Sequence, residues 1–273
     1  MDSILTEKLD IAYDDTLIVK ALNMNIPHGK ITSIIGPNGC GKSTVLKAVG
    51  RILKPRNGMV YLSGDDIRKL STKEIARKMA ILPQTPTAPS GLTVSELVSY
   101  GRFPHQRGFG KLTPEDKKIV KWAIFVTKLP ELEHREVDTL SGGQRQRVWI
   151  AMALAQQTGL ILLDEPTTYL DLAHQLEVLE LLFGLNRNQK VTIVMVLHDL
   201  NLAARFSDYM IAIRGGNIIR HGGPDEVMRP GVLRDVFSID AEVVCEPRTG
   251  RPVCLTYDLM RGPEPLRKED AAI

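Results

Sequence analysis

The sequence contains no apolar run long enough to cross a membrane. A membrane-spanning helix needs roughly 20 consecutive apolar residues, whereas runs such as Ile193 to Leu197 and Leu160 to Leu163 are short. The first residues, MDSILTEKLD, carry acidic side chains and lack the apolar segment of a secretory signal. We therefore expect neither a membrane span nor a signal peptide.

Cysteine is scarce as well. The 273 residues include three cysteines, Cys40, Cys245 and Cys254. So small and odd a number is typical of a reducing compartment and does not suffice for a four-cysteine metal site. We expect all three to be unpaired packing residues.

The chain also has little net charge, because 35 basic residues face 32 acidic residues and leave +3. Such a balance does not by itself indicate nucleic acid or an anionic membrane as a partner. The composition, 43% hydrophobic and 25% charged, excludes a disordered, collagen-like or disulfide-stabilised chain. The length corresponds to about two domains of ~150 residues, or to one large domain with insertions.

Strands and helices alternate at both ends of the chain, which predicts an α/β fold with a parallel-sheet core. Alternating apolar residues predict strands within residues 1–30. Apolar runs predict buried strands at 31–35, 160–164 and 191–197. Residues 87–157 have mainly helical patterns, and we interpret them as a helical insert rather than an independent domain.

A glycine-rich loop follows the first buried strand. Residues 36–43, GPNGCGKS, match the phosphate-loop pattern G-x-x-x-x-G-K-[ST] without mismatch, and a helix is expected from about Ser43 to Leu53. Backbone N–H groups of such a loop turn toward phosphate oxygens, and the helix adds its positive N-terminal end. Lys42 would reach the β- and γ-phosphates, and the Ser43 hydroxyl would bind Mg²⁺. The predicted nucleotide contacts are Gly36, Pro37, Asn38, Gly39, Cys40, Gly41, Lys42, Ser43 and Thr44.

This motif alone indicates only a P-loop NTPase, a class that includes kinases, GTPases, helicases and transport ATPases. A second feature narrows the choice. The buried strand at 160–163 ends in Asp164 and Glu165, and the C-terminal ends of parallel strands meet beside the phosphate loop. Asp164 can then hold Mg²⁺, and Glu165 can polarise an attacking water. A pair of solvated acids is the alternative.

A third feature lies 20 residues before Asp164, counted from Gln144. Leu140 to Gln144, LSGGQ, precedes a helix, and a Ser-Gly-Gly entry to a helix makes a second anion-binding site. Read alone, the segment could be an ordinary helix N-cap. The predicted contacts of this segment are Ser141, Gly142, Gly143 and Gln144.

With these three features, the sequence resembles the ATP-binding cassette family, the ATPase subunits of ABC transporters. The resemblance implies a P-loop cassette over about residues 4–240, with an N-terminal antiparallel β subdomain, and a short extension at 241–273. It also implies roles for four further residues. Tyr13 would stack on adenine, Gln84 would sense Mg²⁺ and the attacking water, and His198 would contact the γ-phosphate. Asp171 would communicate across a dimer.

In this family two cassettes enclose two ATP molecules, so the resemblance implies an ATP-dependent homodimer. Ser141, Gly142, Gly143 and Gln144 would bind the ATP that the partner's phosphate loop holds. The loop before Asp171 reads Thr168-Tyr169-Leu170, where the family usually has Ser-Ala-Leu. The role of the tyrosine stays open.

Several stretches resemble the ATPase subunits of iron(III)–siderophore importers more closely. They are residues 101–116, 141–156, 164–182 and 197–208. The resemblance implies a peripheral ATPase on the cytoplasmic face of a bacterial membrane. It would dock on separate permease subunits through the helical insert near Gln84. A siderophore-binding lipoprotein would be an indirect partner, and no nucleic-acid partner is expected. Cobalamin and haem importer ATPases share much of this pattern and remain alternatives.

Six basic residues within 101–121 are expected either to form a solvated face or to contact a permease loop: Arg102, Arg107, Lys111, Lys117, Lys118 and Lys121. The sequence argues against two other functions, a soluble ABC ATPase and a P-loop kinase. A soluble ABC ATPase acting on DNA or the ribosome usually carries a coiled-coil insert or two cassettes, and neither is present. A P-loop kinase does not explain the LSGGQ segment, Asp171 and His198 together.

Overall fold

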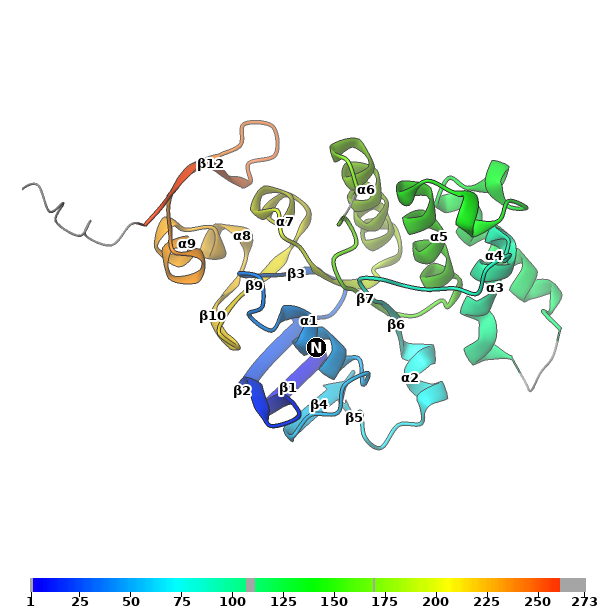
Figure 1. Ribbon diagram of the computed structural model, residues 1–273, viewed down its shortest axis with the longest axis horizontal. Coiled ribbons are helices and arrows are strands. Elements are labelled where there is room, and N and C mark those ends of the chain that lie inside the picture. The colour runs from blue at the N-terminus through cyan, green and yellow to red at the C-terminus, as the bar shows by residue number, and fades with distance from the viewer. Residues whose placement is uncertain (1, 107–110, 169, 261–273) are drawn as a thin grey trace, which may run out of the picture.

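A six-stranded sheet forms the centre of the molecule (Figure 1). The computed structural model describes residues 2–106, 111–168 and 170–260. In order across the sheet, the strands are β10 (Asn217–Gly222), β9 (Tyr209–Arg214), β3 (Ile31–Ile35), β8 (Thr192–Val196), β7 (Leu160–Leu163) and β6 (Met79–Leu82). Every neighbouring pair is parallel except β9 and β10. The predicted parallel core is confirmed.

A second, antiparallel sheet comes from the N-terminal part of the chain. Its strands, in order, are β2 (Thr16–Pro27), β1 (Asp2–Tyr13), β4 (Asn57–Leu62) and β5 (Asp65–Asp66). The antiparallel β subdomain that the family resemblance implied is therefore present. A separate hairpin of β11 (Ile239–Cys245) and β12 (Pro252–Leu259) follows near the C-terminus.

Helices lie on both faces of the central sheet. The α-helices are α1 (Lys42–Val49), α2 (Thr72–Lys78), α3 (Val94–Ser99), α4 (Pro114–Val126), α5 (Gly142–Ala155), α6 (Leu172–Gln189), α7 (Leu200–Phe206), α8 (Pro224–Val227) and α9 (Pro230–Phe237). Three short 3₁₀ helices are η1 (Tyr100–His105), η2 (Pro130–Leu132) and η3 (Val137–Thr139). Along the chain, α3, α4 and α5 lie between β6 and β7. The segment from α3 to α5 lies to one side of the central sheet in Figure 1.

Four helices begin at a capping box. Ser71, Thr93, Thr113 and Ser141 each cap a helix with a side-chain oxygen, and in each case the residue three positions later bonds back to the cap. The end of α1 was predicted less well. The helix ends at Val49 rather than near Leu53, because Gly50 forms its C-cap and Arg51 adopts a left-handed φ of 57°.

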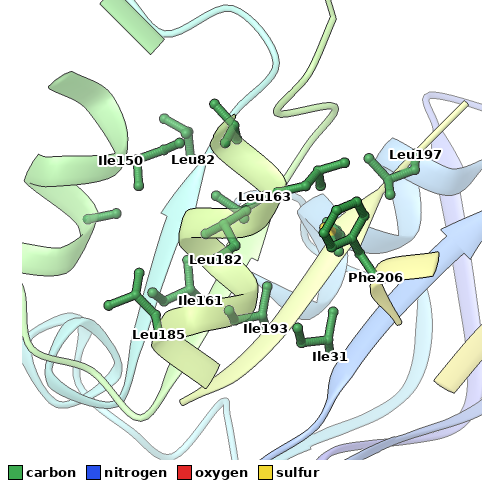
Figure 2. Packing of buried hydrophobic residues seen from close by; sticks show 14 of the residues in the cluster. Ile31, Leu82, Ile150, Ile161, Leu163, Leu182, Leu185, Ile193, Leu197 and Phe206 are labelled. Carbon is green, nitrogen blue, oxygen red and sulfur yellow. The ribbon is translucent and has the colours of Figure 1, made fainter. Parts of the chain in front are cut away.

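The central strands are apolar throughout because both faces of the sheet are covered. On β7, Ile161 and Leu163 face a core shared with α6, α7 and the segment from α3 to α5, whereas Leu160 and Leu162 face α1 and the N-terminal sheet. Figure 2 shows the first of these cores, with Leu182 of α6 packed over the strands. No helix in the described ranges is long and apolar enough to span a membrane.

Arg102 does not belong to a solvated basic face. The residue is 5% exposed, and its guanidinium donates to the Asp116 carboxylate at 2.8 Å and to the backbone oxygen of Ala155 at 2.7 Å. Burial alone would raise the pKa of Asp116, but hydrogen bonds from Arg102 and Thr113 outweigh it and lower the pKa. Arg102 therefore joins η1 to α4 and to the end of α5.

The other members of that basic group are placed as expected or are not described. Lys111, Lys117, Lys118 and Lys121 are exposed, and Arg107 lies outside the described residues. The three cysteines are free thiols, and Cys40 and Cys254 are buried. Cys245 is exposed, so the prediction of a packing role was wrong for it.

We predict that Arg102→Ala lowers the free energy of unfolding by about 3–5 kcal/mol, because it leaves the Asp116 carboxylate buried and unpaired. Chemical denaturation at neutral pH measures this loss. Arg102→Ala combined with Asp116→Asn should recover part of it, since the asparagine oxygen can still accept the Thr113 backbone N–H but carries no charge. Lys118→Ala breaks an exposed pair with Glu115 and should change stability by less than about 0.5 kcal/mol. Equal losses for Arg102→Ala and Lys118→Ala would contradict the burial argument.

Candidate functional site

A cavity of about 510 Å³ opens at the C-terminal ends of the central strands. It brings together most of the phosphate loop with three residues predicted from distant parts of the sequence, Gln84, Glu165 and His198. The lining residues are Ile18, Asn38, Gly39, Gly41, Lys42, Ser43, Thr44, Gln84, Glu165, Thr168 and His198.

Strand order explains why these residues meet. The phosphate loop follows β3, His198 follows β8, Asp164 and Glu165 follow β7, and Gln84 follows β6. These four strands are consecutive neighbours and parallel. Their C-terminal ends therefore share one edge of the sheet, which is where ligands bind in open α/β sheets.

The phosphate loop is compact and turns its lysine inward. Lys42 is 5% exposed, and its ammonium group donates to the backbone oxygens of Gly36 and Pro37 at 2.9 Å each. Gly41, the N-cap of α1, has a φ of 101° and offers no capping side chain. The first N–H groups of α1 are thus available to an anion.

The loop begins so close to β9 that a side chain at Gly36 would not fit. A Cβ on Gly36 would lie 2.1 Å from the backbone oxygen of Ile213, on β9. At the turn between β9 and β10, Gly216 donates its backbone N–H to the Cys40 oxygen at 3.0 Å. Sequence analysis missed Gly216, and a glycine pair between two strands was the available signal.

Asp164 lies directly against α1. The Ser43 hydroxyl donates to its carboxylate at 2.7 Å, and its backbone N–H donates to the Leu82 oxygen at 2.9 Å. Burial, and then the neighbouring charge of Glu165, raise the pKa of Asp164 even though the Ser43 hydrogen bond opposes them. The carboxylate is held in a place where a bound cation would stabilise its charge.

Glu165 is held by three donors. His198 lies 2.7 Å from one carboxylate oxygen, while Gln84 at 2.7 Å and Thr168 at 2.9 Å donate to the other. Burial alone would raise the pKa of Glu165, but these hydrogen bonds, that of His198 first, outweigh it and lower the pKa. Glu165 is therefore a carboxylate at neutral pH. Its own φ of 53° is left-handed, so the strand turns sharply there.

Two residues of the cavity were missed by sequence analysis. Thr168 donates to Glu165 and lies three residues after it, a spacing that could have suggested the contact. Ile18 comes from β2 of the other sheet. Only the folded chain brings that strand to the phosphate loop.

Other predicted site residues do not line this cavity. Tyr13, at the end of β1, is 43% exposed. Ser141 caps α5 by accepting from the Gln144 N–H, Gln144 accepts the Ser141 N–H in return, and Ser141 and Gly142 are exposed. Asp171 is exposed and caps α6.

Comparisons with known proteins identify the family. The sequence profile described as "ABC transporter" matches residues 19–168, more than half of the chain. The chain belongs to the ABC transporter family.

Relatives agree over nearly the full length. The iron(3+)-hydroxamate import ATP-binding protein FhuC of Bacillus subtilis is 63% identical over 97% of this chain and 99% of its own. The ferric enterobactin transport ATP-binding protein FepC of Escherichia coli is 44% identical over 90% of this chain and 91% of its own. The resemblance to siderophore importer ATPases that the motifs indicated is confirmed.

Solved structures support the fold. An inward-facing metal-chelate type ABC transporter matches with a TM-score of 0.80 and 29% identity, over 93% of this chain and 98% of that one. The dimeric cassette MJ0796 matches with a TM-score of 0.72 and 31% identity, over 81% of this chain and 98% of that one.

We predict that Lys42→Ala weakens ATP affinity roughly tenfold to hundredfold, equivalent to about 1.5–3 kcal/mol, because it removes charge-assisted hydrogen bonds to phosphate. Titration with a fluorescent ATP analogue measures the affinity. Lys54→Ala, at an exposed lysine after α1, is the control and should leave the affinity unchanged. An unaltered affinity for Lys42→Ala would remove the loop from the nucleotide site.

Proposed function

We propose that this chain is the ATPase subunit of a ferric-siderophore importer, which binds and hydrolyses ATP as a homodimer on a separate membrane permease. The ATPase part of the proposal rests on one cavity, which the phosphate loop, Gln84, Glu165 and His198 line. Asp164 lies next to it and accepts a hydrogen bond from Ser43. The siderophore cargo is supported by the 63% identity to a hydroxamate import ATP-binding protein.

The phosphate loop would bind the β- and γ-phosphates of ATP. N–H groups of the loop and of the first turn of α1 would donate to the phosphate oxygens, and Lys42 would add a full positive charge. Without phosphate, the Lys42 ammonium bonds to Gly36 and Pro37. Nucleotide binding would exchange those neutral carbonyl partners for charged oxygens, which are stronger acceptors.

The residues predicted to hold Mg²⁺ fit that ion. Ser43, Gln84 and Asp164 offer a hydroxyl, an amide and a carboxylate oxygen, which are the hard ligands that Mg²⁺ prefers. The Gln84 side-chain N–H donates to Glu165, so its oxygen is the atom that would face a cation. When bound, Mg²⁺ would neutralise charge on the phosphates.

Glu165 is the candidate general base. A carboxylate has about four lone-pair positions, and His198, Gln84 and Thr168 occupy three in this arrangement. The remaining position can accept a hydrogen bond from a water and orient it toward the γ-phosphate. His198 and Gln84 would thereby fix the base and also face the nucleotide cavity.

The second half of each ATP site would come from a partner copy. Ser141 and Gly142 are exposed at the start of α5 and lie outside the cavity of their own chain. In a dimer with two-fold symmetry, each chain can present this segment to the other's phosphate loop. Asp171 would lie at the same interface, and Tyr13 would stack on the adenine.

The helical insert, about residues 87–157, would contact the permease. It begins just after Gln84, and its 3₁₀ helix η1 exposes Phe103 at 57% while Phe103 stacks on Tyr100. Aromatic side chains are enriched at protein interfaces, so the exposed Phe103 is suited to contact a docked partner. The ATPase would then work on the cytoplasmic face of the membrane, with Mg²⁺ and ATP, and a siderophore-binding lipoprotein would deliver cargo from the other side.

We predict that Glu165→Gln retains ATP binding and loses at least roughly 100-fold in hydrolysis rate, since general bases contribute about 10²–10⁴. With hydrolysis blocked, ATP should trap the dimer. Phosphate release and sedimentation velocity measure the two effects. Glu131→Gln, at an exposed glutamate of η2, should behave as wild type. Turnover that survives in Glu165→Gln would remove Glu165 from the role of base.

The cargo is tested in cells. A strain that lacks the gene should fail to take up iron from a ferric hydroxamate, and the wild-type gene but not its Lys42→Ala variant should restore uptake. Uptake of haem and of cobalamin in the same strains tests the two alternative cargos. Normal uptake of every ferric siderophore, in a strain without a second such ATPase, would contradict the proposed cargo. An uptake defect confined to cobalamin would favour a cobalamin importer ATPase, and one confined to haem would favour a haem importer ATPase.

A further inference from the structure

Helices α5 and α6 begin close together, although α5 belongs to the predicted helical insert and α6 follows the catalytic strand β7 (Figure 1). Ser141 caps the first helix and Asp171 caps the second. Both caps are residues of the proposed dimer interface. The contact between the two helix starts therefore connects two parts of the nucleotide site.

His174, in the first turn of α6, forms this contact. The Asp171 carboxylate accepts a hydrogen bond from the His174 backbone N–H at 2.9 Å and lies 2.7 Å from Nδ1 of its ring. These two bonds, the backbone bond first, lower the pKa of Asp171. Because one carboxylate oxygen holds both the backbone and the ring, the ring orientation is fixed.

The ring edge that faces away from Asp171 packs on Gly143. A Cβ placed on Gly143 would lie 2.7 Å from the His174 Cδ2 atom and 3.0 Å from Cγ. Gly143 is buried, whereas Ser141 and Gly142 just before it are exposed. The His174 ring thus occupies the space where a side chain at position 143 would lie.

We propose that His174 is a positioning residue that sets where the Ser141–Gly143 segment stands relative to Asp171. The inference rests on the proposed function, because the segment matters only if it binds the partner's ATP. A shift of the segment would misplace its N–H groups relative to the γ-phosphate of the partner's ATP. Contacts of this kind are sensitive to small displacements.

A second contact joins the same helices one turn further along. Arg147 and Glu177 approach within 3.8 Å, which is longer than a hydrogen bond. The contact of the His174 ring with Gly143 is therefore the closer of the two contacts between these helices. The 2.7 Å bond to Asp171, within the start of α6, orients that ring. A purely local capping role is the alternative, since the backbone bond to Asp171 would remain with any residue at position 174.

The test uses the Glu165→Gln background, in which ATP is expected to trap the dimer. Adding His174→Ala should weaken ATP-dependent dimerisation roughly tenfold, while the ATP affinity of the monomer and the melting temperature change little. His174→Asn keeps a donor for Asp171 but removes the ring from Gly143. It should weaken the dimer as His174→Ala does.

A double-mutant cycle makes the contact itself measurable. Gly143→Ala should weaken the dimer because its Cβ meets the fixed ring. His174→Ala should weaken the dimer less in the Gly143→Ala background than it does alone, because the smaller side chain at position 174 removes the clash with the new Cβ. Additive effects, or dimerisation unchanged by His174→Ala, would overturn the role of His174 while leaving the proposed function intact. If Glu165→Gln itself forms no dimer with ATP, both proposals fail.

Discussion

The hydrogen bond from Ser43 to Asp164 joins segments 121 residues apart, and the rest of the site depends on the strand order that allows it. Because β3, β8 and β7 are parallel neighbours, the start of α1 faces the end of β7. That fixes Asp164 beside the phosphate loop and places Glu165 one residue further into the cavity. The neighbouring strands β8 and β6 then deliver His198 and Gln84 to the same edge. Both faces of the sheet must be covered to hold this register, which is why its strands are apolar throughout.

The site concentrates groups that are unfavourable in a folded protein without ligand. Asp164 is a buried carboxylate with a raised pKa, Lys42 is a buried ammonium bonded to neutral carbonyls, and α1 begins without a capping side chain. Each of these would be stabilised by a triphosphate and its cation. Buried charges and uncapped helix starts of this kind are characteristic of functional sites. They also explain why a net charge of +3 said little about an anionic ligand, since the anion chemistry lies in one lysine and a few N–H groups.

Motifs formed by residues close together in the sequence could be predicted, whereas contacts between distant segments could not. The phosphate loop, the capping boxes and the buried strands depend on residues close together in the chain, so their patterns predict them. Arg102 was placed in a solvated face because its partner Asp116 and the Ala155 carbonyl meet it only in three dimensions. Ile18 and Gly216 reach the phosphate loop from other strands for the same reason. The contact of His174 with Gly143 likewise joins residues 31 positions apart (174 − 143), and no local signal marks it.

One chain brings its phosphate loop and Glu165 to one cavity, while its Ser141 segment is exposed outside that cavity. Two copies of the chain are therefore proposed to complete each other's sites. A crystal structure of the Glu165→Gln variant grown with ATP and Mg²⁺ tests this arrangement. We expect a two-fold dimer in which each γ-phosphate contacts Lys42 of one chain and the Ser141 segment of the other. A γ-phosphate contacted by residues of one chain alone would contradict it.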